Sequence, residues 1–172
     1  MVDQKQNVEM AEEKAFRESS QNKWDGMSKW YTFVEPFAYQ SATTCLVMSN
    51  AHNCKRVLEV GCGPGLHSEL IAKSILQPNG GLLVSCDFSK EMVSMMKRRY
   101  ENSEYSKLEG NHFKFDVETE FTGEDSLTVD PSTLVPADAS RFVYGCMADN
   151  MRLPFPSEFF EAYVSNLSLM LV

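Results

Sequence analysis

The turn Gly61-Cys62-Gly63-Pro64-Gly65 limits the possible folds of this chain more than any other segment. It directly follows Val57-Leu58-Glu59-Val60, a short apolar run that is typical of a buried strand. Glycines at alternate positions let the backbone turn sharply and approach a bound group, because a Cβ would clash there or exclude a positive φ. The sequence therefore predicts a strand that enters a helix through a turn able to cradle a ligand.

The residues after this turn alternate between helical and strand patterns. Apolar residues recur at helical intervals over 66–76, and the proline and glycines of 78–81 end that pattern. Residues 82–86 are again strand-like, and Ser89 then offers an N-cap for a further helix. Strand, helix, strand units have parallel strands, so we predict an α/β protein with a Rossmann-like parallel sheet and flanking helices.

Two units are expected along the chain. Residues 1–50 are predicted to form an N-terminal helical cap in which a second helix begins at Pro36. Residues 51–172 are predicted to form the Rossmann-like domain, with further strands over 142–147 and 159–172. Residues 103–141 hold nine acidic and three basic side chains, so we expect a peripheral acidic insertion there, after which the main sheet resumes at Arg141. Within the insertion, the alternation of Phe113, Phe115 and Val117 is compatible with a strand.

An apolar stripe at near-helical spacing within the cap is interpreted as core packing; it consists of Trp24, Met27, Trp30, Tyr31 and Val34. Tyr31 is also a candidate for lining an acceptor pocket, although simple packing is the commoner role of such a residue.

Composition argues against several classes of function. The formal net charge is -8, which disfavours nucleic acid as a partner, because that affinity depends on clustered Lys and Arg. The five cysteines show no C-x-x-C spacing and the three histidines are scattered, so no metal site is predicted. No apolar stretch is long enough for a membrane span and no signal peptide is apparent, so we expect a cytoplasmic protein.

The spacing of the glycines separates two kinds of ligand. The dinucleotide pattern is G-x-G-x-x-G, and Leu66 stands where its third glycine belongs, which disfavours a nicotinamide cofactor. Asp87 falls at the end of the second strand, where a carboxylate can accept hydrogen bonds from both hydroxyls of a ribose. A tight turn without a ligand and an ordinary acid at a helix start are the alternatives for these two features.

The motifs resemble those of class I S-adenosylmethionine-dependent methyltransferases. The run Leu58 to Gly65 is similar to their first motif, and Asp87-Phe88-Ser89-x-x-Met92 resembles their second-strand signature. Residues 148–155 and 159–166 are similar to the third and fourth motifs of the small-molecule subgroup related to quinone-biosynthesis methyltransferases. The resemblance covers about residues 56–102 and 141–172, and it implies S-adenosyl-L-methionine as the cofactor and a small molecule as the methyl acceptor.

The resemblance also implies a set of cofactor-binding residues: Glu59, Gly61, Cys62, Gly63, Gly65, Asp87, Phe88, Met92, Asp149, Asn150 and Asn166. Glu59 and the glycines are expected to hold the methionine end, and Asp87 the ribose. Phe88 and Met92 are expected to pack on adenine. Asp149 is expected to accept from the exocyclic amine while the backbone of Asn150 meets a ring nitrogen; an ordinary loop acid is the alternative for Asp149.

Catalysis of methyl transfer requires mainly alignment of the reactants and exclusion of water, so no catalytic residue is assigned. The segment Ser165-Asn166-Leu167-Ser168 offers no obvious general base. It also lacks the Asn/Asp-Pro-Pro-aromatic sequence of family members that methylate nucleobase amines.

Family members continue beyond the fourth predicted strand with further strands and helices, whereas this sequence ends at Val172. We therefore expect a sheet that is incomplete on its C-terminal side, with an exposed edge for self-association or a protein partner. A non-catalytic cofactor-binding subunit or pseudo-enzyme is the alternative function, and a nicotinamide-dependent oxidoreductase is a third.

Overall fold

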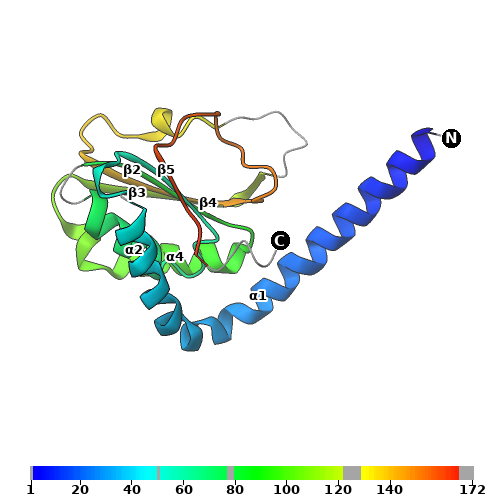
Figure 1. The fold of residues 1–172 in the computed structure, drawn as a ribbon, viewed down its shortest axis with the longest axis horizontal. Coiled ribbons are helices and arrows are strands. Elements are labelled where there is room, and N and C mark those ends of the chain that lie inside the picture. Colours follow the sequence, from blue (N-terminus) through cyan, green and yellow to red (C-terminus); the bar gives the residue numbers. More distant parts are fainter. Residues whose placement is uncertain (1, 50, 77–79, 122–128, 167–172) are drawn as a thin grey trace.

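The computed structural model describes residues 2–49, 51–76, 80–121 and 129–166, and it contains a five-stranded parallel sheet. The strand order is β3-β4-β2-β1-β5. The strands are β1 (Arg56–Val60), β2 (Gly81–Asp87), β3 (Asn111–Phe121), β4 (Arg141–Ala148) and β5 (Ala162–Val164). The predicted α/β class with a Rossmann-like parallel sheet is confirmed (Figure 1).

Helices cover one face of this sheet. They are α2 (Leu66–Ile71), which continues into the π-helical turn η2 (Ala72–Leu76), and α4 (Lys90–Asn102). Short 3-10 turns complete the described elements: η1 (Ala51–Asn53), η3 (Glu104–Lys107) and η4 (Pro131–Leu134). Ser89 caps α4 as predicted, because its Oγ accepts from the backbone N–H of Met92 at 3.2 Å.

The core has two layers because alternate strand residues point to opposite faces. Beneath α2 and α4, the buried strand residues include Val57, Leu83 and Val143. On the other face, the buried strand residues include Leu58, Val84, Phe142 and Tyr144. Irregular segments cover this second face (Figure 1). Apolar side chains from 134–139 and 153–160 pack on it. The helices and the irregular segments thus bury both faces of the sheet.

The N-terminal segment is one helix, α1 (Val2–Met48), so the expected second start at Pro36 is wrong. Pro36 lies inside the helix. A proline there removes one backbone hydrogen bond and its ring presses on the preceding turn, which bends a helix without ending it. Figure 1 shows α1 bending in its second half, the half that contains Pro36, so that the helix has two arms of different direction.

The apolar stripe of the cap is only partly packed. Trp30 is 69% exposed and Val34 is also exposed, so the interpretation of the whole stripe as core is wrong. Phe33 and Phe37 extend this outward-facing apolar surface of α1. Helical spacing identifies an apolar face of a helix, but it does not show whether that face packs on the sheet or lies in solvent.

The acidic segment 103–141 contains a strand of the main sheet, contrary to expectation. β3 pairs with β4 in parallel from Asn111 opposite Arg141 to Asp116 opposite Cys146, so the sheet resumes well before Arg141. Phe115 packs against the core and its ring lies 5.5 Å from that of Tyr100. Within this segment, the described residues that lie outside the sheet are 103–110 and 129–140.

β5 is shorter than the predicted strand over 159–172. It covers Ala162–Val164 and pairs with β1 at one edge of the described sheet. Glu161 lies just before β5, and its N–H donates to the carbonyl of Arg56 at 2.8 Å. The remainder of the predicted strand falls partly in 167–172, which lie outside the described residues.

The packing around Gly65 predicts that a methyl group added at this position would destabilise the fold. Its φ is +84°, and an added Cβ would lie 2.4 Å from Cγ of Met96. We expect Gly65→Ala to lower the free energy of unfolding by about 2–4 kcal/mol through strain and overpacking. Gly26→Ala is the matched control, because nothing lies within 4 Å of that position in α1, and it should stabilise by about 0.5–1 kcal/mol. Equal effects in urea denaturation would contradict this account.

Candidate functional site

A cavity opens at the carboxyl ends of β1, β2 and β4. The strand order reverses at β1, with β2 on one side and β5 on the other, and ligands of open parallel sheets bind at such a point. The cavity is lined by Glu13, Phe16, Arg17, Ser20, Trp24, Tyr31, Val60, Gly61, Gly63, Asp87, Phe88, Met92, Ala148, Asp149, Asn150, Met151 and Asn166.

The glycine turn presents its backbone to this cavity. Gly61 and Gly63 have φ of 71° and 54°, a region that side chains disfavour. The N–H groups of Gly61 and Cys62 both donate to the carbonyl of Cys86, at 2.8 and 3.1 Å. The turn is therefore anchored to the end of β2, and at Gly61 and Gly63 the cavity is lined by backbone without side chains.

Asp87 at the end of β2 holds the turn and the start of α4 together. Its Oδ2 accepts from the N–H of Gly63, and its Oδ1 accepts from the N–H of Ser89, both at 2.9 Å. Burial raises the pKa of Asp87, an effect that these hydrogen bonds oppose and the nearby carboxylate of Asp25 reinforces. Each carboxylate oxygen still has a second lone pair for a ligand hydroxyl.

Glu59 lies behind the turn and not in the lining of the cavity. The residue is 3% exposed, and its Oε2 accepts from Oγ of Ser68 at 2.6 Å and from Oγ of Ser85 at 2.7 Å. Burial raises the pKa of Glu59 to about 7, against the effect of these two hydrogen bonds. Glu59 thus supports the glycine turn from the core side.

Two further predicted residues also lie outside the cavity lining. Cys62 is buried in the core beneath α2 and α4, with its thiol 3.6 Å from the carbonyl oxygen of Gly63. Gly65 faces Met96 of α4, and the absence of a side chain there lets the turn and α4 pack closely. The first motif therefore divides into residues that face the cavity and residues that pack the turn.

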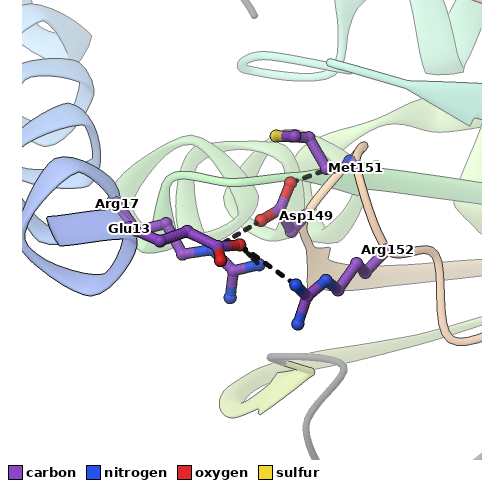
Figure 2. Close-up of polar contacts among 5 residues, drawn as sticks. All are labelled: Glu13, Arg17, Asp149, Met151 and Arg152. Carbon is purple, nitrogen blue, oxygen red and sulfur yellow. Dashed lines mark hydrogen bonds and ion pairs between the residues drawn. The ribbon is translucent and has the colours of Figure 1, made fainter. Parts of the chain in front are cut away.

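Asp149 follows β4, which lies on the other side of β2 from β1 in the sheet. Its Oδ1 accepts from the N–H of Met151 at 2.8 Å, and its Oδ2 lies 3.2 Å from Nε of Arg17 in α1 (Figure 2). Asn150 beside it accepts from the hydroxyl of Tyr163 at 2.9 Å. Asp149 and Asn150 share the lining with Phe88 and Met92, so the structure brings these predicted residues together.

One wall of the cavity comes from α1 and was not predicted as part of the cofactor site. Its residues lie on one helical face: Glu13, Phe16, Arg17, Ser20, Trp24 and Tyr31. Apart from the adjacent Phe16 and Arg17, successive members are three, four or seven residues apart, a spacing that is visible in the sequence and could have indicated a common face. The direction of that face depends on how α1 lies on the sheet, which local patterns do not specify.

Tyr31 lines the cavity as expected and lies against the glycine turn. A Cβ on Gly63 would be 3.4 Å from its ring. Burial raises the pKa of the Tyr31 phenol, and the negative charges of Asp87 and Glu35 raise it further. The hydroxyl therefore keeps its proton at neutral pH and is available as a donor.

Asn166 lines the cavity and also ties the residues after β5 to the second arm of α1. Its Nδ2 donates to the carbonyl of Ala38 at 3.0 Å, and its Oδ1 accepts from Oγ of Ser41 at 2.9 Å. Nδ1 of His67 lies 3.2 Å from the same Nδ2. Burial lowers the pKa of His67, which favours its neutral ring beside this amide.

The described ranges hold neither a candidate metal centre nor a candidate membrane span. There, no three or more His, Cys, Asp or Glu side chains are grouped so that they could hold a metal ion. No helix in those ranges combines the length and the apolar character that crossing a membrane requires. All five cysteines are free thiols, and three of them are buried.

The side chains that line the cavity have the chemistry to hold a nucleoside. Asp87 offers carboxylate acceptors for vicinal hydroxyls, and Asp149 offers an acceptor for an amine on a flat ring. Met92 and Phe88 add apolar surface to the same lining, and the turn at Gly61 and Gly63 admits a close approach of the backbone.

Comparison with known proteins supports this assignment for part of the chain. Residues 57–129 match a family model described as a methyltransferase domain. Searches of curated proteins and of solved structures gave no match. The matched range includes the glycine turn and Asp87 and ends before Asp149. It supports the resemblance to class I S-adenosylmethionine-dependent methyltransferases.

The buried carboxyl of Glu59 predicts a specific pH dependence. Between pH 4.5 and about 7 the folded chain keeps a proton that the unfolded chain releases, so the free energy of unfolding falls as pH rises through this window. The fall attributable to Glu59 is at most about 3 kcal/mol. A glutamine side chain does not titrate, so Glu59→Gln should be less pH-dependent in urea denaturation at pH 5 and pH 8. The same pH dependence in both proteins would contradict the raised pKa.

Proposed function

We propose that this protein is an S-adenosylmethionine-dependent methyltransferase that acts on a small-molecule acceptor. The observation that carries the proposal is that one cavity joins the glycine turn, Asp87 and Asp149, which come from three neighbouring strand ends. The match of residues 57–129 to a methyltransferase domain supports it independently of the geometry.

The cofactor's nucleoside would be held by groups that are already arranged. Asp87 would accept from the ribose hydroxyls while Gly63 and Ser89 keep its carboxylate in place. Asp149 would accept from the adenine amine, and Phe88 and Met92 would pack on the ring. The backbone at Gly61 and Gly63 would face the methionine end, with Glu59 supporting the turn from behind.

The chain would promote methyl transfer by alignment and by exclusion of water. When bound, the cofactor supplies an electrophilic methyl group on a positively charged sulfur. The wall of α1 lies over the carboxyl edge of the sheet and shields the cavity with Phe16, Trp24 and Tyr31. Such shielding strengthens electrostatic interactions and fixes the approach of the acceptor. No residue is assigned as a general base.

An apolar, ring-containing acceptor fits this wall best, in keeping with the subgroup related to quinone-biosynthesis methyltransferases. Trp24 and Tyr31 offer aromatic surface, and the protonated hydroxyl of Tyr31 can donate to an oxygen of the acceptor. Tyr31 lies against Gly63, so an acceptor placed there would be close to the methionine end of the cofactor.

Calorimetric titration with S-adenosylhomocysteine tests the cofactor site. We expect micromolar binding that Asp87→Ala weakens by at least about tenfold, because hydrogen bonds to a charged group are lost. Asp138→Ala is the control, since that carboxylate is exposed and is not among the lining residues. A nicotinamide dinucleotide should not compete.

Three outcomes would separate the possible functions. Absence of binding by a folded wild-type chain would refute the proposal, and preference for the dinucleotide would favour an oxidoreductase. Binding of S-adenosylhomocysteine without transfer of a labelled methyl group to any of a panel of phenols and quinols would favour the non-catalytic subunit.

A further inference from the structure

We infer that Arg17 of α1 is a positioning residue for Asp149, and that it thereby determines how strictly the site selects an amino-bearing purine. The inference rests on the proposed function, because it concerns the adenine end of that cofactor site. Arg17 lies outside the motifs that identify the site, and it is brought there by the path of α1 across the sheet edge.

The contacts hold the carboxylate of Asp149 from two sides (Figure 2). The N–H of Met151 donates to Oδ1 at 2.8 Å, and Nε of Arg17 lies 3.2 Å from Oδ2. The side chains of Arg17 and Asp149 are 16% and 11% exposed. An ion pair that is this well shielded is screened much less than a surface pair, so the positive charge of Arg17 attracts Oδ2 and opposes its movement away from α1.

Glu13 in turn holds the guanidinium of Arg17 in place. Its Oε1 lies 3.1 Å from Nη2 of Arg17 and 3.2 Å from Nη2 of Arg152 (Figure 2). Charges therefore alternate in the order Asp149, Arg17, Glu13, Arg152, and the two outer members belong to the loop after β4. This arrangement joins one turn of α1 to the loop that carries the adenine acceptor.

A carboxylate fixed in this way discriminates between an amine and an oxo group. Each oxygen of Asp149 has a second lone pair, which can accept from the amine of adenine. An oxo group at the same ring position would place one acceptor against another, and this repulsion is avoided only if the carboxylate turns away. Met151 and Arg17 together oppose that rotation, so removal of Arg17 should relax the selectivity.

The experiment is calorimetric titration of the full chain with S-adenosylhomocysteine and with its deaminated analogue, S-inosylhomocysteine. The variants are Arg17→Ala, Arg17→Lys and Arg152→Ala, with Lys14→Ala as the control for loss of one exposed positive charge on the same helix. Thermal melts establish that each variant is folded. The measured quantity is the ratio of the two dissociation constants.

We expect Arg17→Ala to weaken S-adenosylhomocysteine binding by about tenfold and to bring the ratio towards one. Arg17→Lys should recover part of the ratio, because it keeps the charge and loses the planar guanidinium. Arg152→Ala breaks only the link to Glu13, so it should leave the ratio near the wild-type value, as should Lys14→Ala.

Two results would overturn the inference and leave the proposed function intact. An unchanged ratio in Arg17→Ala, with both ligands weakened equally, would mean that Arg17 only docks α1. Tighter binding in Arg17→Ala would mean that the guanidinium competes with adenine for Asp149. Failure of the wild-type chain to bind either ligand would instead refute the proposed function itself.

Discussion

The bridging carboxylate of Asp87 is the interaction on which the arrangement of the site depends. The carboxylate lies at the end of β2 and accepts from the N–H groups of Gly63 and Ser89. It therefore joins the glycine turn after β1 to the N-cap of α4. The glycine turn, 24 residues earlier in the sequence, is thereby fixed to the junction between β2 and α4. Because each carboxylate oxygen of Asp87 already accepts from a backbone N–H, the side chain is oriented before any ligand arrives. This lowers the entropy cost of ordering the side chain on binding.

Polar contacts, and not apolar packing alone, hold α1 over this site. Asp25 accepts from the Oγ of Ser89 and from the N–H of Glu91 at the start of α4. Near the bend, Nη2 of Arg99 donates to both carboxylate oxygens of Glu35, at 2.7 and 2.8 Å. Directional contacts of this kind determine which face of α1 turns towards the cavity, while Trp30 on another face stays exposed.

The sequence was sufficient to predict the Rossmann-like class, the glycine turn and the cap at Ser89, because each depends on a local pattern of apolar, glycine or capping residues. β3 was assigned to a peripheral insertion because nine acidic side chains outnumber three basic ones over 103–141. The alternation of Phe113, Phe115 and Val117 indicates a strand, but it does not show that this strand pairs with β4. The contribution of Arg17 to the site required the path of a whole helix, which no short window of sequence contains.

The position of the bend in α1 has a mechanical consequence. The Glu35–Arg99 pair sits next to Pro36, so the helix is held at its bend, while Glu13 of the first arm lines the cavity. At 1.5 Å per residue, Glu13 lies about 33 Å along the helix from that pair. A tilt of about 10° there would displace Glu13 by about 6 Å, which the contacts of Asp25 with α4 and the Arg17–Asp149 pair oppose, so the first arm is fixed along its length and not only at the bend.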